Sequence, residues 1–473
     1  MPFMNERMVI LGAGIAGLTT AWRLHQAGIP VTILEQSSHA GGCIRTMRES
    51  GYTLELGPNT FLNSSKELWD LAGSAGLANE KIETPREIGK TRYIFKDEKL
   101  IKVPAGPNIL FSGVLSIKGR LRLLREPFIK PLVLQNPSFD RLRMSERTGR
   151  MNGLDESLAS FITRRLGPEV LDTLVTPFVS GIYAGDPEKL SIKAIFPKLI
   201  DIERKFGSIM KGMKELKGDI KSTGLGSFIG GIGSLSQTLE SKLKDSIIYN
   251  ARALSIEKLN GTYQIKYEDD GEPKTVLAPN LICALPTYAA SNAFSTLSDV
   301  LKENLSLIEY APIAVVHTGY KKKDIERPLD GFGFLVPRKQ KVRILGSLWS
   351  SALFGGRAPE GHALMTSFIG GILDPEALDL TNDDMMRTVQ KDLLKVLGIK
   401  AKPAFACITR YTHAIPQYNI GHVKKIERIT ATLEHLPGLF MTGSYFDGIS
   451  VAATIEHANV TAEKAIRHIT KAL

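Results

Sequence analysis

The sequence predicts an α/β fold divided among several domains, in the wider sense of an α+β multidomain protein. The chain has 473 residues, more than one ordinary hydrophobic core can hold. Its first 35 residues read as a short apolar strand, a glycine turn, an amphipathic helix and a second strand. Helical patterns dominate residues 89–206, and strand-like runs return after them. We therefore expect a Rossmann-like domain, a mixed-sheet domain and an inserted helical domain.

Residues 8–35 carry the pattern of a dinucleotide-binding unit. Gly12 permits a sharp exit from the first strand, Gly14 lets a diphosphate approach the backbone, and Gly17 lets the helix pack closely on the sheet. The helix N-terminus offers amide donors and a partial positive charge to the diphosphate. An acid at the end of the second strand can accept hydrogen bonds from ribose hydroxyls and disfavours a 2′-phosphate. The expected contacts are Gly12, Ala13, Gly14, Ala16, Gly17 and Glu35.

Two further glycine-containing stretches favour FAD over a nicotinamide dinucleotide. "AGGCIRT" follows shortly after the acid, and "GYTLELGPNTF" comes next. An FAD that lies extended across its domain needs further close approaches of the backbone at its diphosphate and flavin ends. The alternative is an ordinary glycine turn between strands. The expected additional contacts are Gly41, Gly42, Ile44, Gly57, Pro58 and Asn59.

Residues 438–469 read as a strand, a glycine turn and a long helix. Such a unit can return to the first domain and place its turn beside the flavin. The expected contacts are Gly443, Gly448, Ile449, Ser450 and Val451. The resulting division has FAD-binding parts at 1–88, 207–290 and 425–473, a helical membrane- and substrate-binding domain at 89–206, and a substrate-binding domain at 291–424.

The formal net charge of +11 is unevenly distributed. Residues 118–150 hold nine basic and three acidic residues, interleaved with leucine, isoleucine and phenylalanine. Two explanations stay open: a solvated helix face, or a surface that rests on anionic lipid. A nucleic-acid partner is disfavoured because no aromatic stacking series accompanies the charge. Without a signal peptide or an apolar run long enough to span a bilayer, we expect a cytoplasmic protein, peripheral on the cytoplasmic face of a membrane.

The sequence offers no protein nucleophile motif and no metal motif. Cys43, Cys283 and Cys407 are far apart and sit in apolar surroundings, so buried, reduced thiols are expected. His413, His422 and His457 are expected to have structural roles, with a metal site as the less favoured alternative. The chemistry is therefore assigned to the flavin, with no catalytic protein residue.

Six segments in order resemble the oxygen-dependent protoporphyrinogen oxidases. They are "ELGPNTF" (55–61), "PFVSGIYAGDPEKLS" (177–191), "GFGFLVP" (331–337), "LWSSALFGGRAPEGHALMTSFIGG" (348–371), "IPQYNIGH" (415–422) and "GLFMTGSYFDGISV" (438–451). The resemblance implies a flavoenzyme of haem or chlorophyll synthesis with FAD-binding, substrate-binding and helical membrane-binding domains. It further implies removal of six electrons from protoporphyrinogen IX in three rounds, through FAD to dioxygen, with release of hydrogen peroxide.

The resemblance also implies roles for particular residues. Arg92 is similar to the family's arginine that pairs with a propionate, and Gly181 to a glycine whose backbone approaches the macrocycle. Ala253 is placed beside the adenine. From the residues alone, Arg92 would be a surface cation and the apolar residues ordinary core. The apolar walls that clamp the pyrrole rings are expected at Leu335, Leu348 and Phe368.

The chain departs from the family's pattern at two positions. Ser444 stands where relatives often have asparagine, and Ala452 where they often have glycine, so packing around the flavin's pyrimidine edge is expected to differ. Coproporphyrinogen III, which carries four carboxylates, is the alternative substrate, although no cation cluster beyond Arg92 can be placed from sequence. An amine oxidase or a carotene desaturase is disfavoured by the mid-chain motifs. A flavin-binding membrane scaffold without turnover, and the oligomeric state, including a homodimer, stay open.

Overall fold

The computed structural model describes residues 8–104, 106–131, 155–215 and 224–471. Its first sheet has five parallel strands in the order β10-β2-β1-β14-β20. The strands come from four distant parts of the chain, and their buried faces are typical of a parallel sheet covered on both sides. They are β1 (Val9–Leu11), β2 (Thr32–Leu34), β10 (Ile247–Ile248), β14 (Leu281–Cys283) and β20 (Leu439–Met441).

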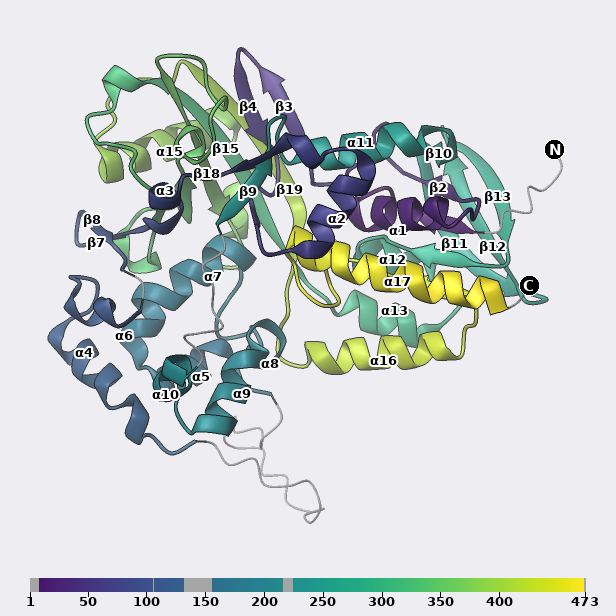
Figure 1. Cartoon of the computed structure of the whole chain (residues 1–473), viewed down its shortest axis with the longest axis horizontal. Coiled ribbons are helices and arrows are strands. Elements are labelled where there is room, and N and C mark those ends of the chain that lie inside the picture. The colour runs from purple at the N-terminus through teal and green to yellow at the C-terminus, as the bar shows by residue number, and fades with distance from the viewer. Residues whose placement is uncertain (1–7, 105, 132–154, 216–223, 472–473) are drawn as a thin grey trace.

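The two ends of the chain meet on one face of this sheet. Helix α17 (Val451–Lys471) lies beside α1 (Ile15–Gln26), as the yellow and purple ribbons in Figure 1 show. Arg23 Nε donates a hydrogen bond to Asn459 Oδ1 at 2.9 Å between them. Helices α2 (Lys66–Ala75) and α11 (Gly233–Leu243) share the same hydrophobic core. Segments far apart in the sequence thus form one parallel sheet and the helices that cover it.

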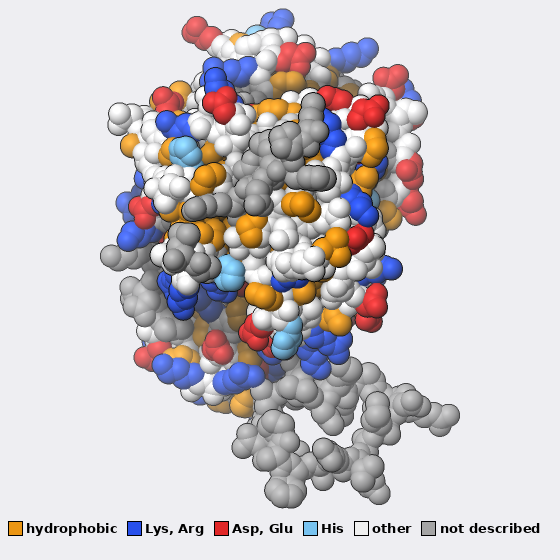
Figure 2. Space-filling model, turned by 90° about the vertical axis from the view of Figure 1, so that its right-hand side faces the viewer, with side chains coloured by type: hydrophobic (Ala, Val, Ile, Leu, Met, Phe, Trp, Pro, Cys, Tyr) orange, Lys and Arg blue, Asp and Glu red, His pale blue; other side chains and the backbone are white. Residues whose placement is uncertain are grey.

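A three-stranded antiparallel sheet packs on the other side of the parallel sheet. It consists of β11 (Ala251–Leu259), β12 (Thr262–Asp269) and β13 (Glu272–Ala278). Helices α12 (Thr287–Ala293), α13 (Asp299–Ser306) and α16 (His422–Glu434) contribute side chains to the same core, although α13 lies in the segment 291–424 expected to bind substrate. Figure 2 shows that basic and acidic side chains are interspersed over this end of the molecule.

A seven-stranded mixed sheet forms the second layer, as predicted. Its order is β19-β15-β18-β17-β16-β7-β8, and only the pair β16 and β7 is parallel. Helix α15 (Asn382–Leu397) covers one face. The strands are β7 (Tyr93–Lys96), β8 (Lys99–Lys102), β15 (Tyr310–Lys321), β16 (Gly333–Leu335), β17 (Gly346–Leu348), β18 (His362–Gly370) and β19 (Phe405–Pro416).

The segment 89–206, expected to be helical, begins with a β-hairpin instead. Asp97 and Glu98 have φ of 51° and 59°, the left-handed conformation that closes a two-residue hairpin. This turn allows β7 and β8 to join the mixed sheet. The helical unit that follows comprises α4 (Ile117–Leu124), α5 (Leu158–Arg165), α6 (Pro168–Val170), α7 (Thr176–Tyr183), α8 (Ile192–Ile195), α9 (Pro197–Phe206) and α10 (Ile209–Glu215).

Smaller elements connect these layers. The hairpin of β3 (Thr46–Glu49) and β4 (Tyr52–Glu55) reaches from the parallel sheet toward the mixed sheet, and Figure 1 shows it beside β19. A sheet of β5 (Phe61–Leu62), β9 (Leu225–Phe228) and β6 (Lys81–Glu83) lies below it. Short helices α3 (Arg86–Lys90) and α14 (Ser350–Leu353) flank the mixed sheet. Across the described ranges, no helix combines the length and the apolar character needed to cross a bilayer.

Candidate functional site

The parallel strands end in turns that lie at one edge of the sheet. Leu11 pairs with Cys283, and Cys283 pairs with Met441, so the residues that follow each strand are neighbours. Gly12 has φ +95°, and a Cβ there would approach Ala284 O to 3.3 Å. Gly443 has φ +156° at the end of the third strand. The first and last glycine turns predicted to bind the dinucleotide therefore meet at this edge.

The N-terminus of α1 faces open space. A Cβ on Gly17 would lie 1.9 Å from Gly12 O, so this position cannot carry a side chain without a backbone shift. A Cβ on Gly14 would meet no atom within 4 Å. Helix α1 has no side-chain cap and no acid in its first turn, so its first amide donors lack a side-chain partner. Amide donors of this kind, with room for an approaching group at Gly14, suit an anion such as a diphosphate.

The second glycine stretch lies against the first. Gly41 forms a parallel bridge with Gly14 and donates a hydrogen bond to Ala13 O at 2.8 Å. A Cβ on Gly42 would come 3.3 Å from Gly14 Cα. Gly57 in turn approaches Cys43 O so closely that a Cβ would lie 2.2 Å from it. All three predicted stretches are thus in one place, together with the intervening Ile44 and with Pro58 and Asn59 of the third stretch.

Glu35 is buried and fixed by two backbone donors. Its Oε2 accepts from Ala13 N at 2.6 Å and its Oε1 from Ser37 N at 2.9 Å. Each carboxylate oxygen keeps a lone pair for a further donor such as a ribose hydroxyl. Ala251 N donates to Glu35 O at 2.8 Å, which brings Ala253, two residues further along β11, to the same part of the molecule.

The start of α17 completes this side of the site. Ser450 Oγ accepts a hydrogen bond from Ala453 N at 3.1 Å and so caps the helix, next to Gly448, Ile449 and Val451. The unusual Ser444 is held through its backbone, because Tyr418 Oη donates to Ser444 O at 2.7 Å. The other unusual residue, Ala452, packs against the core between α1 and α17.

Cys43 corrects one expectation. Its side chain is exposed, and desolvation by neighbouring protein atoms raises the pKa of its thiol. Cys43 lies beside Gly42 and Gly57, because a Cβ on Gly57 would lie 2.2 Å from Cys43 O. Cys283 is buried as expected, and Cys407 is half-buried.

The apolar residues predicted to contact substrate share one face of the mixed sheet. Leu335 and Phe368 both pair with Gly346, and Leu348 lies two residues further along the same strand as that glycine. Side chains two residues apart on a strand, or directly opposite across strands, point to the same side. Gly181 of α7 covers this face, since a Cβ there would lie 2.7 Å from Leu335 Cδ2.

Arg92 stands at the end of this apolar face, just before β7. Its Nη1 donates to Gly89 O at 2.9 Å, and its guanidinium carbon lies 5.1 Å from the centre of the Phe332 ring. Desolvation lowers the pKa of Arg92. No salt bridge joins Arg92 to a carboxylate within the described residues. The site thus combines an apolar wall with an unpaired cation.

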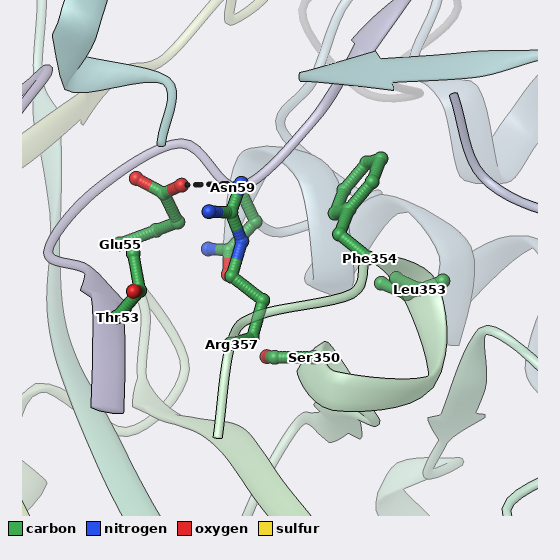
Figure 3. Close-up of a pocket in the computed structure, with 7 residues that line it drawn as sticks. All are labelled: Thr53, Glu55, Asn59, Ser350, Leu353, Phe354 and Arg357. Carbon is green, nitrogen blue, oxygen red and sulfur yellow. Dashed lines mark ion pairs between the residues drawn. The ribbon is translucent and has the colours of Figure 1, made fainter. Parts of the chain in front are cut away.

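A pocket between the hairpin β3–β4 and α14 contains residues that sequence reasoning missed. Figure 3 shows Glu55 and Arg357 pointing toward each other across it. The segments that contain them were quoted as motifs, but nothing in their spacing indicates that they meet. The lining residues are Thr53, Glu55, Asn59, Ser350, Leu353, Phe354 and Arg357.

The three histidines considered as metal ligands have separate aromatic partners. His422 stacks on Tyr418 with ring centroids 4.0 Å apart, and His457 stacks on Phe446 at 4.4 Å. His413 lies against Tyr288 at 4.5 Å. In the described part of the chain, no group of potential metal ligands comes together.

A family model for flavin-containing amine oxidoreductases matches residues 15–466. The chain belongs to this family. FAD is its cofactor, and the free space at Gly14 with the anchored Glu35 fits that group. Protoporphyrinogen oxidase 1 of spinach chloroplasts is 32% identical over 98% of this chain and 84% of its own length. Coproporphyrinogen III oxidase of Staphylococcus aureus is 30% identical over 98% of this chain and all of its own length.

Solved structures share the fold. A protein from Exiguobacterium sp. 255-15, provisionally assigned as a protoporphyrinogen oxidase, superposes with a TM-score of 0.81 at 24% identity, over 98% of this chain and 99% of that chain. Putrescine oxidase with bound putrescine superposes with a TM-score of 0.70 at 16% identity, over 98% of this chain and all of that chain. The resemblance to the porphyrinogen oxidases is thereby confirmed, and the protein is a flavin-dependent oxidoreductase of that group.

Proposed function

We propose that the protein oxidises protoporphyrinogen IX to protoporphyrin IX in porphyrin biosynthesis. Bound FAD supplies a hydride acceptor that passes the electrons on to dioxygen, with release of hydrogen peroxide. The observation that carries the proposal is the apolar face of Leu335, Leu348 and Phe368 with the unpaired Arg92 at its end. A macrocycle with two propionates needs a wide hydrophobic slot and a cation near its mouth.

The chain's own residues have to bind and orient the macrocycle. The apolar face would hold the pyrrole rings flat, Arg92 would pair with a propionate, and the contact of Gly181 with Leu335 would fix the position of that wall residue. Such fixed contacts keep one meso carbon aligned with the hydride acceptor, and alignment is the main contribution a protein makes to this type of transfer.

The test is to incubate the flavin-loaded protein with protoporphyrinogen IX and with coproporphyrinogen III separately. Porphyrin fluorescence and hydrogen peroxide are followed against flavin-free protein and against free FAD. Faster porphyrin formation from protoporphyrinogen IX, with one peroxide for each two electrons, supports the proposal. Flavin binding without turnover of either substrate would favour a flavin-binding scaffold.

Coproporphyrinogen III is the second candidate, and Arg338 favours it. Arg92 precedes β7, whose Tyr93 pairs with Phe334, whereas Arg338 comes three residues after Leu335, so the two cations flank opposite ends of β16. Nε and Nη2 of Arg338 are buried without a hydrogen-bond partner, and desolvation lowers the pKa of its guanidinium. A substrate with carboxylates at both ends would satisfy both cations.

The two candidates are separated by replacing Arg338. If coproporphyrinogen III is the substrate, Arg338→Met should raise its KM about tenfold or more, and Arg338→Lys should restore part of the loss. Lys339→Met is the matched control, because Lys339 is the adjacent cation and pairs with Asp172 at the surface. Equal KM values in Arg338→Met and the control would leave protoporphyrinogen IX as the better candidate.

We also propose that the helical unit makes peripheral contact with the cytoplasmic face of an anionic membrane. Phe111 and Phe128 are 85% and 87% exposed, and Ile117, Leu121 and Leu124 are exposed beside them. Lys118, Arg125 and Lys130 are exposed among these residues, whereas residues 132–150 of the basic segment lie outside the described residues. The buried pair of Glu126 and Arg165 anchors the turn that carries Phe128. Apolar side chains ringed by cations are typical of an interfacial surface.

Vesicle sedimentation tests this contact. The protein should sediment with phosphatidylserine-containing vesicles at low salt and less with phosphatidylcholine vesicles. Phe111→Ser with Phe128→Ser should reduce sedimentation, while Leu62→Ser, another exposed apolar residue elsewhere, should not. Equal sedimentation of both variants, or none of the parent protein, would remove the proposal. A homodimer stays a prediction.

A further inference from the structure

Glu55 of β4 and Arg357 form a buried ion pair at the pocket in Figure 3. Arg357 Nη2 lies 3.4 Å from Glu55 Oε1, and the two side chains are only 2% and 5% exposed. Burying two charges is unfavourable unless they are paired and also satisfied by further hydrogen bonds. The remaining partners of each group therefore indicate what the pair holds together.

Glu55 caps a helix of the cofactor domain from outside that helix. Its Oε1 accepts from Ile232 N at 2.9 Å, just before α11, and its Oε2 accepts from Thr46 Oγ1 at 2.6 Å. Gly233 N donates to the same Thr46 oxygen at 2.8 Å. Helix α11 has no side-chain cap of its own, so these two residues supply it. A carboxylate at a helix N-terminus is stabilised by the helix dipole.

Arg357 binds several segments at once from the loop after α14. Its Nη2 donates to Ser227 Oγ at 2.9 Å and to Phe228 O at 3.1 Å, and its Nη1 donates to Ile229 O at 3.3 Å. Its own carbonyl oxygen accepts from Thr53 N on β4 at 3.1 Å. One guanidinium thus links the end of β9 and the hairpin β3–β4 to the mixed sheet.

Each member of the pair is close in sequence to one side of the candidate site. Glu55 precedes the turn of Gly57 to Asn59, which lies against Cys43 beside the glycine stretches expected to bind the cofactor. Arg357 follows α14, whose Ser350 hydrogen-bonds Thr366 Oγ1 at 2.7 Å and comes two residues after Leu348. The pocket between them is lined from both sides (Figure 3).

We propose that Glu55 and Arg357 are positioning residues that set the distance between the 57–59 turn at the cofactor and the wall at Leu348. The pair acts through the segments it joins and touches neither reacting partner. If it fixes both segments, its loss should weaken FAD binding and substrate binding together. The substrate part of this inference rests on the proposed function, whereas the FAD part rests only on the flavin cofactor.

The experiment compares Glu55→Gln, Arg357→Met and the double variant with the parent protein. Matched controls are Arg252→Met and Glu268→Gln, because that pair has the same charges but is 60% and 35% exposed on the β11–β12 hairpin. FAD dissociation constants are measured by titrating flavin-free protein with FAD and following the quenching of flavin fluorescence. The visible spectrum of the bound flavin, and KM and kcat for each bound flavin, complete the comparison.

We expect each single variant to raise the FAD dissociation constant at least tenfold, to change the flavin spectrum and to raise KM more than it lowers kcat. In the double variant, the FAD dissociation constant should rise by less than the product of the two single-variant increases. The reason is that one buried charge without its partner destabilises the protein more than the removal of both charges. If Arg357→Met does not fold, Arg357→Lys replaces it in the comparison. This variant keeps the positive charge but loses the several hydrogen bonds of the guanidinium, so it should raise the FAD dissociation constant by a smaller factor.

A purely structural pair gives a different result. Variants with a lowered melting temperature but parental FAD affinity, flavin spectrum and KM for each bound flavin would overturn the inference. Weakened FAD binding in protein that oxidises neither porphyrinogen would support the inference for the cofactor while removing the proposed function. Failure of the positioning inference and failure of the proposed function therefore give different results.

Discussion

Gly181 of α7 touches Leu335 of β16: a Cβ at residue 181 would lie 2.7 Å from Leu335 Cδ2. This contact joins the helical unit to the apolar face of the mixed sheet. The atom that would have to move is the far end of a flexible side chain, so the protein can fold with a larger residue at 181. A larger residue at 181 should therefore reduce the space that is left for the substrate.

Gly181→Ala should therefore affect substrate binding more than stability. We expect a loss of about 1 kcal/mol or less in unfolding free energy and a rise in KM of about tenfold, because Leu335 is pushed into the slot. Gly73→Ala is the control, since Gly73 is also in a helix and a Cβ there meets nothing. Chemical denaturation and steady-state kinetics check both; an unchanged KM would show that this contact lies away from the substrate.

Gly14 and Gly17 should separate cofactor binding from folding. A Cβ on Gly14 enters open space in front of α1, so Gly14→Ala should fold normally without FAD but bind FAD at least tenfold more weakly. A Cβ on Gly17 meets Gly12 O at 1.9 Å, so Gly17→Ala should lose roughly 2 kcal/mol or more of stability. Thermal melts of the flavin-free protein measure the stability of both variants, and FAD titrations measure their affinity. Equal stability and equal FAD affinity in the two variants would contradict the assignment of Gly14 to cofactor binding and Gly17 to packing.

Arg92→Met should raise KM without lowering the stability of the fold. Loss of a charge-assisted hydrogen bond to a carboxylate costs about 1.5 to 3 kcal/mol, which corresponds to roughly a 10- to 150-fold rise in KM. Lys90→Met removes a neighbouring exposed cation and serves as the control. If both variants kept the parental KM for either porphyrinogen, Arg92 would be a surface cation only.

The buried histidines predict loss of stability in mild acid. Burial lowers the pKa of His317 and of His422 to about 4, from about 6.5 in the unfolded chain. The fold needs their neutral forms, so their contribution is complete above about pH 6.5 and is lost as the pH falls toward 4. Each histidine should lower the free energy of unfolding by about 2 kcal/mol when the pH falls from 7.5 to 5.

Urea unfolding at the two pH values measures this loss. His422→Gln, which can still donate to Tyr445 O, should remove the part of the pH dependence that His422 contributes, about 2 kcal/mol. His435→Gln replaces an exposed histidine and should leave the dependence unchanged. A stability that stays level from pH 7.5 to pH 5 would show that neither histidine becomes protonated on unfolding.

The cofactor side of the site could be predicted from sequence because its requirements are local. Gly12 needs a positive φ and Gly17 must have no side chain, and both follow from a strand, a turn and a helix in immediate succession. The turn at Gly443 could be placed there because a strand and a helix flank it in the same way. By contrast, the hairpin of β7 and β8 was missed, because whether a short apolar run joins a distant sheet depends on the free edge of that sheet at β16.

The sequence alone indicated which glycine turns meet at the edge of the parallel sheet, because the steric limits on a strand–turn–helix unit depend on adjacent residues. The tertiary structure alone decided that Glu55 meets Arg357, that Gly181 covers Leu335, and that the side chain of Cys43 is exposed. These relations depend on how independently formed layers pack. Packing depends on the shape and chemistry of whole surfaces. The spacing of residues within a motif does not indicate which of these surfaces come into contact.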